Sequence, residues 1–293
     1  MRTSPILLAL TLLFFRPALN AQGETDTRST LSLFSGMMNY QGDLNPNSFS
    51  FNHSQFAAGL IVRKPLNRWF TVRGSFFAGK LTAADRWNRE YLKPRNLSFT
   101  TSLTELTLAL ELNLLNPANS RIVPYMYGGL TYFHYNPWAY DNSGTKTYLK
   151  PLSTEGQGLP QFPTQKAYPL YQWALPFGGG IKYAVSDGFA IGIDFSQRKT
   201  FTDYLDDVSS HYVDAAVLEQ AKGRKSVEMA YRTDEIPGGM PTLPAHGEQR
   251  GTPSEMDWYY YLGLTLEMKL SEAGGIFDLF RRNRVRGQGC PRF

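Results

Sequence analysis

Histidine is the residue type best suited to acid–base chemistry near neutral pH, and the chain has four, His53, His134, His211 and His246. A hydrolytic site needs a histidine and a nucleophile such as serine on the same face, within hydrogen-bond reach. His53 and Ser54 are adjacent, so in an extended strand they point to opposite faces. His134 has no serine or aspartate close to it in the sequence. For each histidine a surface or interfacial position is favoured over a catalytic role, so we expect no catalytic residues.

Carboxylates gather most closely in one stretch, at Asp203, Asp206, Asp207 and Asp214. They offer ligands for calcium, but their spacing lacks the regular pattern of a calcium-binding loop. Aspartate also caps helices, and Asp206 or Asp207 is placed to start a short helix through residues 213–218 that would end near residue 223. The stretch favours an ordered loop, and we expect no bound metal and no other cofactor.

A second set of charged residues alternates with apolar residues along extended segments. The cations of this set are Arg63, Arg73, Lys182, Arg198 and Lys269, and the anions are Glu105, Glu111, Asp194 and Glu267. Charges that face an enclosed interior must pair with one another, because an isolated buried charge is costly. The sequence therefore favours a network of ion pairs and hydrogen bonds, with a proton or ion path as the alternative.

The end of the chain carries the best candidates for binding a partner. An apolar cluster at helical spacing is formed by Ile276, Phe277, Leu279 and Phe280, and five arginines follow it, at 281, 282, 284, 286 and 292. Such a segment suits an interfacial helix on the inner leaflet of a membrane, or a peptide that docks onto an acidic protein. We favour docking. Nothing in the segment resembles a nucleic-acid-binding module.

Cys290 is the only cysteine of the chain. In an oxidising compartment an exposed, unpaired thiol can form an intermolecular disulfide, and a thiol without a role is the alternative. The residues predicted to bind a partner are Ile276, Phe277, Phe280, Arg281, Arg282, Arg284 and Cys290.

The elements that position these residues are best seen at residues 257–270, D-W-Y-Y-Y-L-G-L-T-L-E-M-K-L. Apolar and aromatic side chains from Trp258 to Leu270 occupy the even positions, and mostly polar or small ones from Asp257 to Lys269 occupy the odd positions. This period of two continues for about thirteen residues, whereas strands of water-soluble proteins usually have about five or six. A tilted strand that crosses a bilayer needs about ten residues, an apolar face and interfacial aromatics.

Seven further segments show the same pattern, so the sequence predicts an all-β fold: an eight-stranded antiparallel transmembrane β-barrel. The eight predicted strands cover residues 31–41, 55–64, 69–81, a fourth that ends in 106–115, 125–135, 171–183, 189–198 and 257–270. Connections after the even-numbered strands are short, and those after the odd-numbered strands are longer. Because outer-membrane barrels keep short turns in the periplasm, we expect long extracellular loops and both termini in the periplasm.

The N-terminus reads as a secretory signal peptide, with Arg2, an apolar run at residues 6–15 and small residues near Ala21. The apolar run is too short to span a membrane as a helix. We expect a signal peptide at residues 1–21, an outer-membrane β-barrel at residues 22–270, and a short basic periplasmic tail at residues 271–293 with a possible helix. The composition agrees with a barrel, since 14% of the residues are aromatic.

Four stretches of the sequence carry a resemblance to a known family. They are G-M-M-N-Y-Q-G-D-L at 36–44, T-F-T-D-Y-L-D-D-V-S-S-H-Y-V-D at 200–214, M-A-Y-R-T-D-E at 229–235, and R-G-T-P-S-E-M-D-W-Y-Y-Y-L-G-L at 250–264. These strings resemble the PorG-type outer-membrane barrels of the type IX secretion system. The likeness covers most of the mature chain and is densest in its last third.

The resemblance implies a non-enzymatic accessory barrel of the secretion and gliding machinery, in the outer membrane of a Gram-negative bacterium. Its partners would be the periplasmic ring proteins of the PorK lipoprotein and PorN type, together with outer-membrane lipid. We expect the basic tail and Cys290 to bind that ring. Two alternatives stay open: a self-contained surface barrel for adhesion or membrane stabilisation, and a barrel enzyme that modifies lipid.

Overall fold

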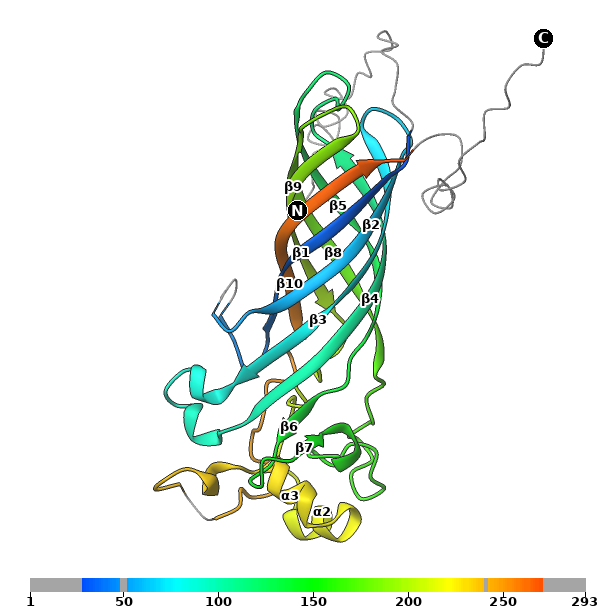
Figure 1. Cartoon of the computed structure of the whole chain (residues 1–293). Helices are drawn as coiled ribbons and strands as arrows, with labels where there is room; N and C mark the ends of the chain where they lie inside the picture. The colour runs from blue at the N-terminus through cyan, green and yellow to red at the C-terminus, as the bar shows by residue number, and fades with distance from the viewer. Residues whose placement is uncertain (1–27, 48–51, 240–241, 271–293) are drawn as a thin grey trace, which may run out of the picture.

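Eight long antiparallel strands close into a barrel in the structure, a computed structural model that describes residues 28–47, 52–239 and 242–270 (Figure 1). Each strand pairs with its neighbour in the barrel, and β1 pairs with β10, with Thr30 opposite Lys269 and Gln41 opposite Trp258. The strands are β1 (Thr30–Gln41), β2 (Gln55–Pro65), β3 (Phe70–Ala84), β4 (Ser98–Asn113), β5 (Ile122–His134), β8 (Tyr171–Ala184), β9 (Phe189–Thr200) and β10 (Trp258–Lys269). The predicted fold class is confirmed.

Strand boundaries differ from the prediction by a few residues. β3 continues to Ala84 and pairs with Ser98 of β4, because the two strands extend together beyond the other strands of the barrel. β8 runs through Pro176, but the pairing of β5 with β8 is interrupted there and resumes at Thr131 opposite Ala174. Because proline has no amide hydrogen to donate, it is tolerated where the hydrogen bonds to the neighbouring strand are interrupted on one side.

Side chains alternate between an outer apolar surface and a closed interior. Along β4, Leu106 and Leu108 are 62% and 65% exposed, whereas Glu105 is 2% exposed and Glu111 is fully buried. Exposed leucines of this kind form a belt around the barrel, and aromatic residues flank it at both ends. Residues of the belt and its flanks include Leu60, Trp69, Phe70, Leu110, Met126, Leu130, Tyr132, Tyr171, Trp173, Tyr183, Ile193 and Leu264. A water-exposed belt of this size is unfavourable, but it matches a bilayer core.

Two residues assigned to the lipid side are covered instead. Tyr260 is 1% exposed, and its ring lies 6.4 Å from that of Phe195. Leu270 is 8% exposed, and its amide donates to the carbonyl of Ser29. Tyr260 lies near the start of β10 and Leu270 directly follows its end, and at these positions the period-two rule does not decide exposure.

The long connections gather beyond one end of the barrel and form the outer-loop assembly, which comprises the described residues of 42–54, 85–97, 135–170 and 201–257 (Figure 1). It contains the hairpin β6 (Trp138–Tyr140) and β7 (Lys146–Tyr148), and the helices α2 (Ala215–Lys222) and α3 (Arg224–Ala230). Single turns of 3-10 helix are η1 (Asp85–Trp87), η2 (Lys93–Arg95), η3 (Lys150–Leu152) and η4 (Thr233–Glu235). Across the described ranges, every helix is too short or too polar to span a membrane.

The predicted helix exists, but it starts later than expected. Its N-cap is Asp214, whose side chain accepts from the amide of Val217 at 3.0 Å. The prediction that Asp206 or Asp207 starts the helix is wrong, because both carboxylates are engaged in buried hydrogen bonds with tyrosines. Gly223 ends the helix as expected, with φ of 83°.

Candidate functional site

The barrel interior near the short turns is filled by a network of buried charges. Arg63 binds Glu111 at 2.9 Å and Glu267 at 2.6 Å. Glu111 also accepts from Lys182 at 2.6 Å. These residues come from β2, β4, β8 and β10, so the network connects strands across the lumen and not only along the sheet. The predicted pairing of charges across the interior is confirmed here.

The network continues toward the middle of the barrel through Asp194. Arg73 binds Asp194 at 2.7 Å, and the hydroxyl groups of Tyr125 and Tyr127 donate to the same carboxylate at 2.6 and 2.9 Å. The guanidinium of Arg73 lies 3.9 Å from the ring centroid of Tyr127. A cation over an aromatic face is stabilised by the ring's quadrupole, and here it replaces some of the missing hydrogen bonds of Nε and Nη2.

A third group of polar side chains closes the lumen toward the outer-loop assembly. Arg198 binds Glu105 at 2.7 Å, and the hydroxyl of Tyr259 donates to Glu105 at 2.7 Å. Aromatic rings pack directly beyond it, with Phe133 5.5 Å from Tyr259. An eight-stranded barrel has room for side chains only, and these fill it. Among the residues that the structure describes, these charges are paired in place and occupy the lumen at this level.

Lys269 departs from the predicted network. Its ammonium group lies 3.4 Å from Asp187 in the turn between β8 and β9, and its side chain is about one-third exposed. The end of β10 lies at the rim of the barrel, where the odd-numbered side chains reach solvent. Lys269 therefore belongs to the mouth and not to the buried network.

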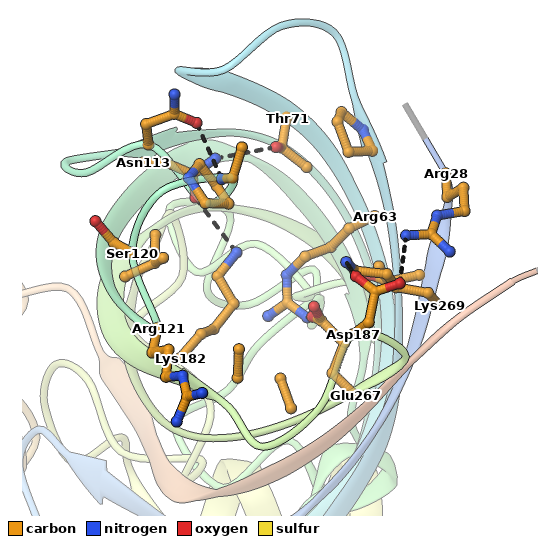
Figure 2. Close-up of a pocket in the computed structure, with 18 of the residues that line it drawn as sticks. Arg28, Arg63, Thr71, Asn113, Ser120, Arg121, Lys182, Asp187, Glu267 and Lys269 are labelled. Carbon is orange, nitrogen blue, oxygen red and sulfur yellow. Dashed lines mark hydrogen bonds and ion pairs between the residues drawn. The ribbon is translucent and has the colours of Figure 1, made fainter. Parts of the chain in front are cut away.

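An open cavity of about 890 Å³ lies at the short-turn end, and we call it the mouth (Figure 2). Arg63 and Lys182 form its floor, Arg28, Arg121 and Lys269 lie around its rim, and Asp187 bonds to Arg28 at 3.4 Å. Two of its lining residues are acidic, Asp187 and Glu267, against the cations Arg28, Arg63, Arg68, Arg121, Lys182 and Lys269. Glu111 also pairs with both floor cations, so the excess of positive charge lies mainly at the rim. A cationic rim suits an anionic ligand or an acidic protein segment.

Buried carboxyl groups hold the outer-loop assembly onto the barrel. The hydroxyl of Tyr40 lies 2.6 Å from Asp206 and 2.8 Å from Asp257. A phenol donates one hydrogen bond, so the second contact requires a proton on one of the carboxyl groups. Burial, together with neighbouring carboxylates, raises the pKa of Asp206 and of Asp257 well above the usual range. Sequence reasoning missed this cluster, because its members lie 166 and 217 residues from Tyr40.

Glu155 makes the second anchor of the loops. It pairs with Arg250 at 2.8 Å and accepts from the amides of Ser209 and Ser210, both at 2.9 Å. Asp207 accepts from Thr154 at 2.5 Å and from Tyr168 at 2.6 Å. These contacts fix the position of residues 203–210, and they explain how the acidic stretch forms an ordered loop. Among the residues that the structure describes, no cluster of histidine, cysteine and carboxylate side chains is arranged to hold a metal.

The predicted partner-binding residues lie outside the described residues, as do residues 1–21 of the predicted signal peptide. Those binding residues are Ile276, Phe277, Phe280, Arg281, Arg282, Arg284 and Cys290. Their roles stay predictions. The histidines lie in aromatic or backbone contacts: His53 stacks on Trp87 at 3.6 Å, and His134 contacts Tyr171 at 4.6 Å.

The closed antiparallel barrel, its apolar belt and its polar interior define a transmembrane β-barrel of the outer-membrane class. Residues 6–223 match the model of the family described as "Domain of unknown function (DUF6089)". Because that match covers most of the chain, the protein belongs to the DUF6089 family. No curated protein matches the chain.

Solved structures of distant outer-membrane barrels share the general fold. Neisserial surface protein A has 8% identity, covers 83% of this chain and 97% of its own, and has a TM-score of 0.42. The outer membrane protein OprG from Pseudomonas aeruginosa has 10% identity, with 86% and 100% coverage and a TM-score of 0.40. Ail of Yersinia pestis, solved with the heparin analogue sucrose octasulfate, has 10% identity, 82% and 98% coverage, and a TM-score of 0.38. Similarities this distant carry no functional conclusion.

Proposed function

We propose that this protein is a non-enzymatic outer-membrane barrel that anchors or caps a periplasmic assembly of the type IX secretion and gliding machinery. The observation that carries the proposal is the cationic mouth above a closed lumen. An interior filled by Arg63, Glu111, Arg73 and Asp194 gives no route for a solute, whereas the mouth offers a recognition surface. The resemblance of residues 200–214 and 250–264 to PorG-type barrels supplies the class of machinery.

The mouth faces the periplasm in this proposal, because short turns of bacterial outer-membrane barrels lie on that side. Leu270 donates from its amide to Ser29 at 2.7 Å, so the tail starts at the rim of the mouth. The tail and the mouth are then parts of one docking surface. Both are basic, and a periplasmic partner with an acidic face complements them. Ring proteins of the PorK lipoprotein and PorN type are the proposed partners.

A pull-down from native membranes in mild detergent, followed by mass spectrometry, tests the anchoring role. We expect periplasmic ring proteins to co-purify with the full chain, and their recovery to fall when residues 276–293 are deleted or when Arg121 at the rim is changed to Glu. Arg89→Glu is the matched control, since Arg89 is exposed at the opposite end of the barrel. If no ring component is recovered with the native chain, the anchoring role is wrong.

A covalent link through Cys290 is a separate part of the proposal. Membranes treated with a thiol-blocking agent should show a slower band on non-reducing gels, which collapses to the monomer with reductant. The band should be absent from Cys290→Ser. Identical migration of the native chain with and without reductant would exclude the disulfide and leave the non-covalent docking untouched.

The second candidate is a self-contained surface barrel for adhesion or membrane stabilisation. Its support is the ordered outer-loop assembly, in which Arg250 and Glu155 are buried ion-pair partners that hold a fixed surface above the barrel. Loss of cell attachment on removal of residues 215–239, with ring proteins still bound, would favour this role. A lipid-modifying activity, the third reading of the sequence, would require loss of a measured activity on changing His53 or His134.

A further inference from the structure

The hairpin of β6 and β7 continues the outer wall of the barrel beyond the apolar belt (Figure 1). Trp138 of β6 pairs with Thr100 of β4. Residues that lie directly opposite each other in an antiparallel sheet share a face. Thr100 is on the outer face of β4, because its neighbours Phe99 and Thr101 are buried on the inner side. One face of the hairpin is therefore an extension of the outer wall.

Three aromatic rings and one ammonium group gather on this outer face of the hairpin. Trp138 pairs with Tyr148, and Tyr140 pairs with Lys146, so all four side chains point to the same side. Tyr140 is 57% exposed and Tyr148 is 44% exposed. The residue between the first two, Ala139, is buried in the core of the outer-loop assembly. The hairpin thus packs with one face and exposes the other.

Hydrogen bonds hold the hairpin in a fixed shape. Asp141 accepts from the amide of Thr145 at 2.9 Å, and its other oxygen accepts from Lys225 of α3 at 3.0 Å. At the base of the hairpin, the amide of Leu149 donates to the carbonyl of Pro137 at 3.0 Å. Because the turn and the base are both fixed, the exposed rings need little ordering when a ligand binds.

Lys146 gives this face a positive charge that no carboxylate balances. Its ammonium group lies 4.5 Å from the ring centroid of Trp138 and 4.8 Å from that of Tyr148. It has no ion-pair partner among the described residues, and the carboxylate of the hairpin, Asp141, is bound by Lys225 instead. A cation held against aromatic rings keeps N–H groups free to donate to an anion.

A row of polar side chains connects the hairpin to the apolar belt. Along the outer face of β4, Leu106 is followed by Thr104, Ser102 and then Thr100. Lys80 of β3 lies opposite Ser102. Lys80 is exposed on the outer wall, and in the described part of the chain it makes no ion pair. The outer wall therefore changes from leucines to hydroxyl groups and cations on the side that leads to the hairpin.

The distance from the belt indicates what these cations meet. A strand rises about 3.3 Å per residue and is tilted by about 40°, so Ser102 lies about 10 Å and Thr100 about 15 Å beyond Leu106 along the barrel axis. Phospholipid headgroups extend only about 5–8 Å beyond the hydrocarbon core on each side. Lipopolysaccharide, the glycolipid of the outer leaflet, carries phosphorylated sugars that extend further. Its saccharide fits the level of the hairpin.

We propose that the outer face of the β6–β7 hairpin, together with Lys80, binds the phosphorylated saccharide of lipopolysaccharide. Lys80 and Lys146 bind its phosphate groups. The rings of Tyr140 and Tyr148 pack against its sugars, and its acyl chains lie along the belt from Leu106. The inference rests on the orientation proposed above, in which the outer-loop assembly is extracellular. It is separate from the anchoring role, because the mouth lies at the opposite end of the barrel.

Native mass spectrometry of the full mature chain released from detergent micelles measures the bound lipid. The probes are rough lipopolysaccharide, the same glycolipid after removal of its phosphates, its deacylated core, and phosphatidylglycerol. We expect rough lipopolysaccharide to bind at least tenfold more tightly than phosphatidylglycerol, a difference of about 1.4 kcal/mol, and dephosphorylation to reduce that advantage. Equal affinity for lipopolysaccharide and phosphatidylglycerol overturns the proposal. Deacylated core that binds as tightly as the intact glycolipid also overturns it, in favour of a soluble saccharide.

Two double variants test whether binding occurs on this face. Lys80→Gln with Lys146→Gln removes both charges and should lower the affinity for lipopolysaccharide about tenfold or more, with phosphatidylglycerol unaffected. Tyr140→Ser with Tyr148→Ser should weaken the dephosphorylated glycolipid as well, since ring contacts do not need phosphate. Lys222→Gln is the matched control, an exposed lysine at the end of α2. All variants are compared after heat-modifiable migration shows that they fold. Unchanged affinity in both double variants overturns the site.

Labelling of intact cells tests the orientation on which the inference rests. Lys146→Cys in a Cys290→Ser background should react with a membrane-impermeant maleimide before the cells are lysed. Reaction only after lysis would place the hairpin in the periplasm and overturn the lipopolysaccharide site. The double lysine variant should recover periplasmic ring proteins like the native chain. A native chain that recovers ring proteins but does not prefer lipopolysaccharide overturns this inference and leaves the anchoring role intact.

Discussion

Several charged residues of the lumen each contact more than one residue of opposite charge, and Glu111 is the clearest case. It is fully buried and lies 2.9 Å from Arg63, 2.6 Å from Lys182 and 3.6 Å from Arg73. Because these cations come from three different strands, Glu111 joins opposite walls of the barrel. An arginine or lysine left without its carboxylate in this interior keeps its charge and loses its compensation.

Changing Glu111 to Gln should therefore destabilise the barrel by about 3–5 kcal/mol, the usual cost of removing one partner of a buried ion pair. Guanidinium unfolding in detergent micelles, followed by tryptophan fluorescence, measures the effect. Glu90→Gln is the control, because Glu90 and its partner Lys93 are exposed and the pair should contribute little. Equal unfolding midpoints for the two variants would contradict a structural role of the network.

The carboxyl groups of the outer-loop assembly predict a dependence on pH. Burial, with Asp206 nearby, raises the pKa of Asp203 to about 9, and burial raises the pKa of Asp207 to about 6. A group whose pKa is higher in the folded state holds its proton more tightly there. Its stabilisation is complete below the ordinary pKa of 3.8 and is lost as the pH rises to about 9 for Asp203 and to about 6 for Asp207.

Limited proteolysis of residues 201–257 should accordingly become faster between pH 5 and pH 9, while the strands stay protected. Asp203→Asn mimics the protonated acid, so in this variant the acceleration should be reduced. The cleavage rate of an unfolded reference peptide at each pH corrects for the protease itself. A loop that is cut at one corrected rate across this range would show that these carboxyl groups do not control its opening.

At the scale of the elements, the two faces of each strand lie in different environments, the apolar outer surface and the polar interior of the barrel. Leu264 of β10 is 62% exposed on the outer surface, and its neighbour Thr265 is 1% exposed in the interior. Their partners in β9 show the same division, with Ile193 outside and Gly192 inside. The strands β1 and β10 also approach each other closely at Gly36 and Gly263. A Cβ on Gly36 would lie 2.5 Å from the Cα of Gly263, so there is room only for glycine at this pair.

Leu264→Arg should destabilise the folded barrel in lipid vesicles by about 2–4 kcal/mol, because the charge enters the middle of the apolar belt. Leu243→Arg makes the same change at a 42% exposed position of the outer-loop assembly and should be nearly neutral. Urea titration with heat-modifiable migration on gels as the readout measures both. If the two variants unfold alike, the outer surface of β10 does not face lipid.

For the whole molecule, the closed lumen determines transport behaviour. The ion pairs of Arg63, Arg73 and Arg198 lie at successive levels of the barrel, and the aromatic layer around Phe133 follows. Water and ions therefore enter the mouth but meet a filled interior below it. Purified protein in planar bilayers should show no steady large conductance.

A porin in the same bilayers supplies the positive control for that measurement. The double variant Arg63→Ala with Glu111→Ala removes one residue of the floor of the mouth and the carboxylate that pairs with it, while leaving the layer of Arg198 and Glu105 in place. It should still be non-conducting, provided that it folds as judged by gel migration. Nanosiemens channels formed by the native chain would contradict the closed lumen.

The sequence by itself determined the strands, their faces and the class of fold. Strand residues such as Leu106 and Glu105 alternate in type with a period of two, and an extended chain turns alternate side chains to opposite sides, so local geometry alone relates the pattern to the two surfaces. It also indicated which charges face the interior, because within each strand they have the opposite parity to the apolar face. Exceptions occur at the strand ends, at Tyr260 and Lys269, where parity no longer decides what covers a side chain.

Only the tertiary structure decided which groups meet. Tyr40 shares its hydroxyl between Asp206 and Asp257, and Arg250 reaches Glu155 across 95 residues of sequence. No local pattern encodes such pairs, because they depend on how four long connections pack against each other. The same holds for the side-chain Nε2 of Gln157 and Oδ1 of Asn136, which are buried without a hydrogen-bond partner among the described residues. The lack of a partner can be recognised only when the positions of all neighbouring residues are known.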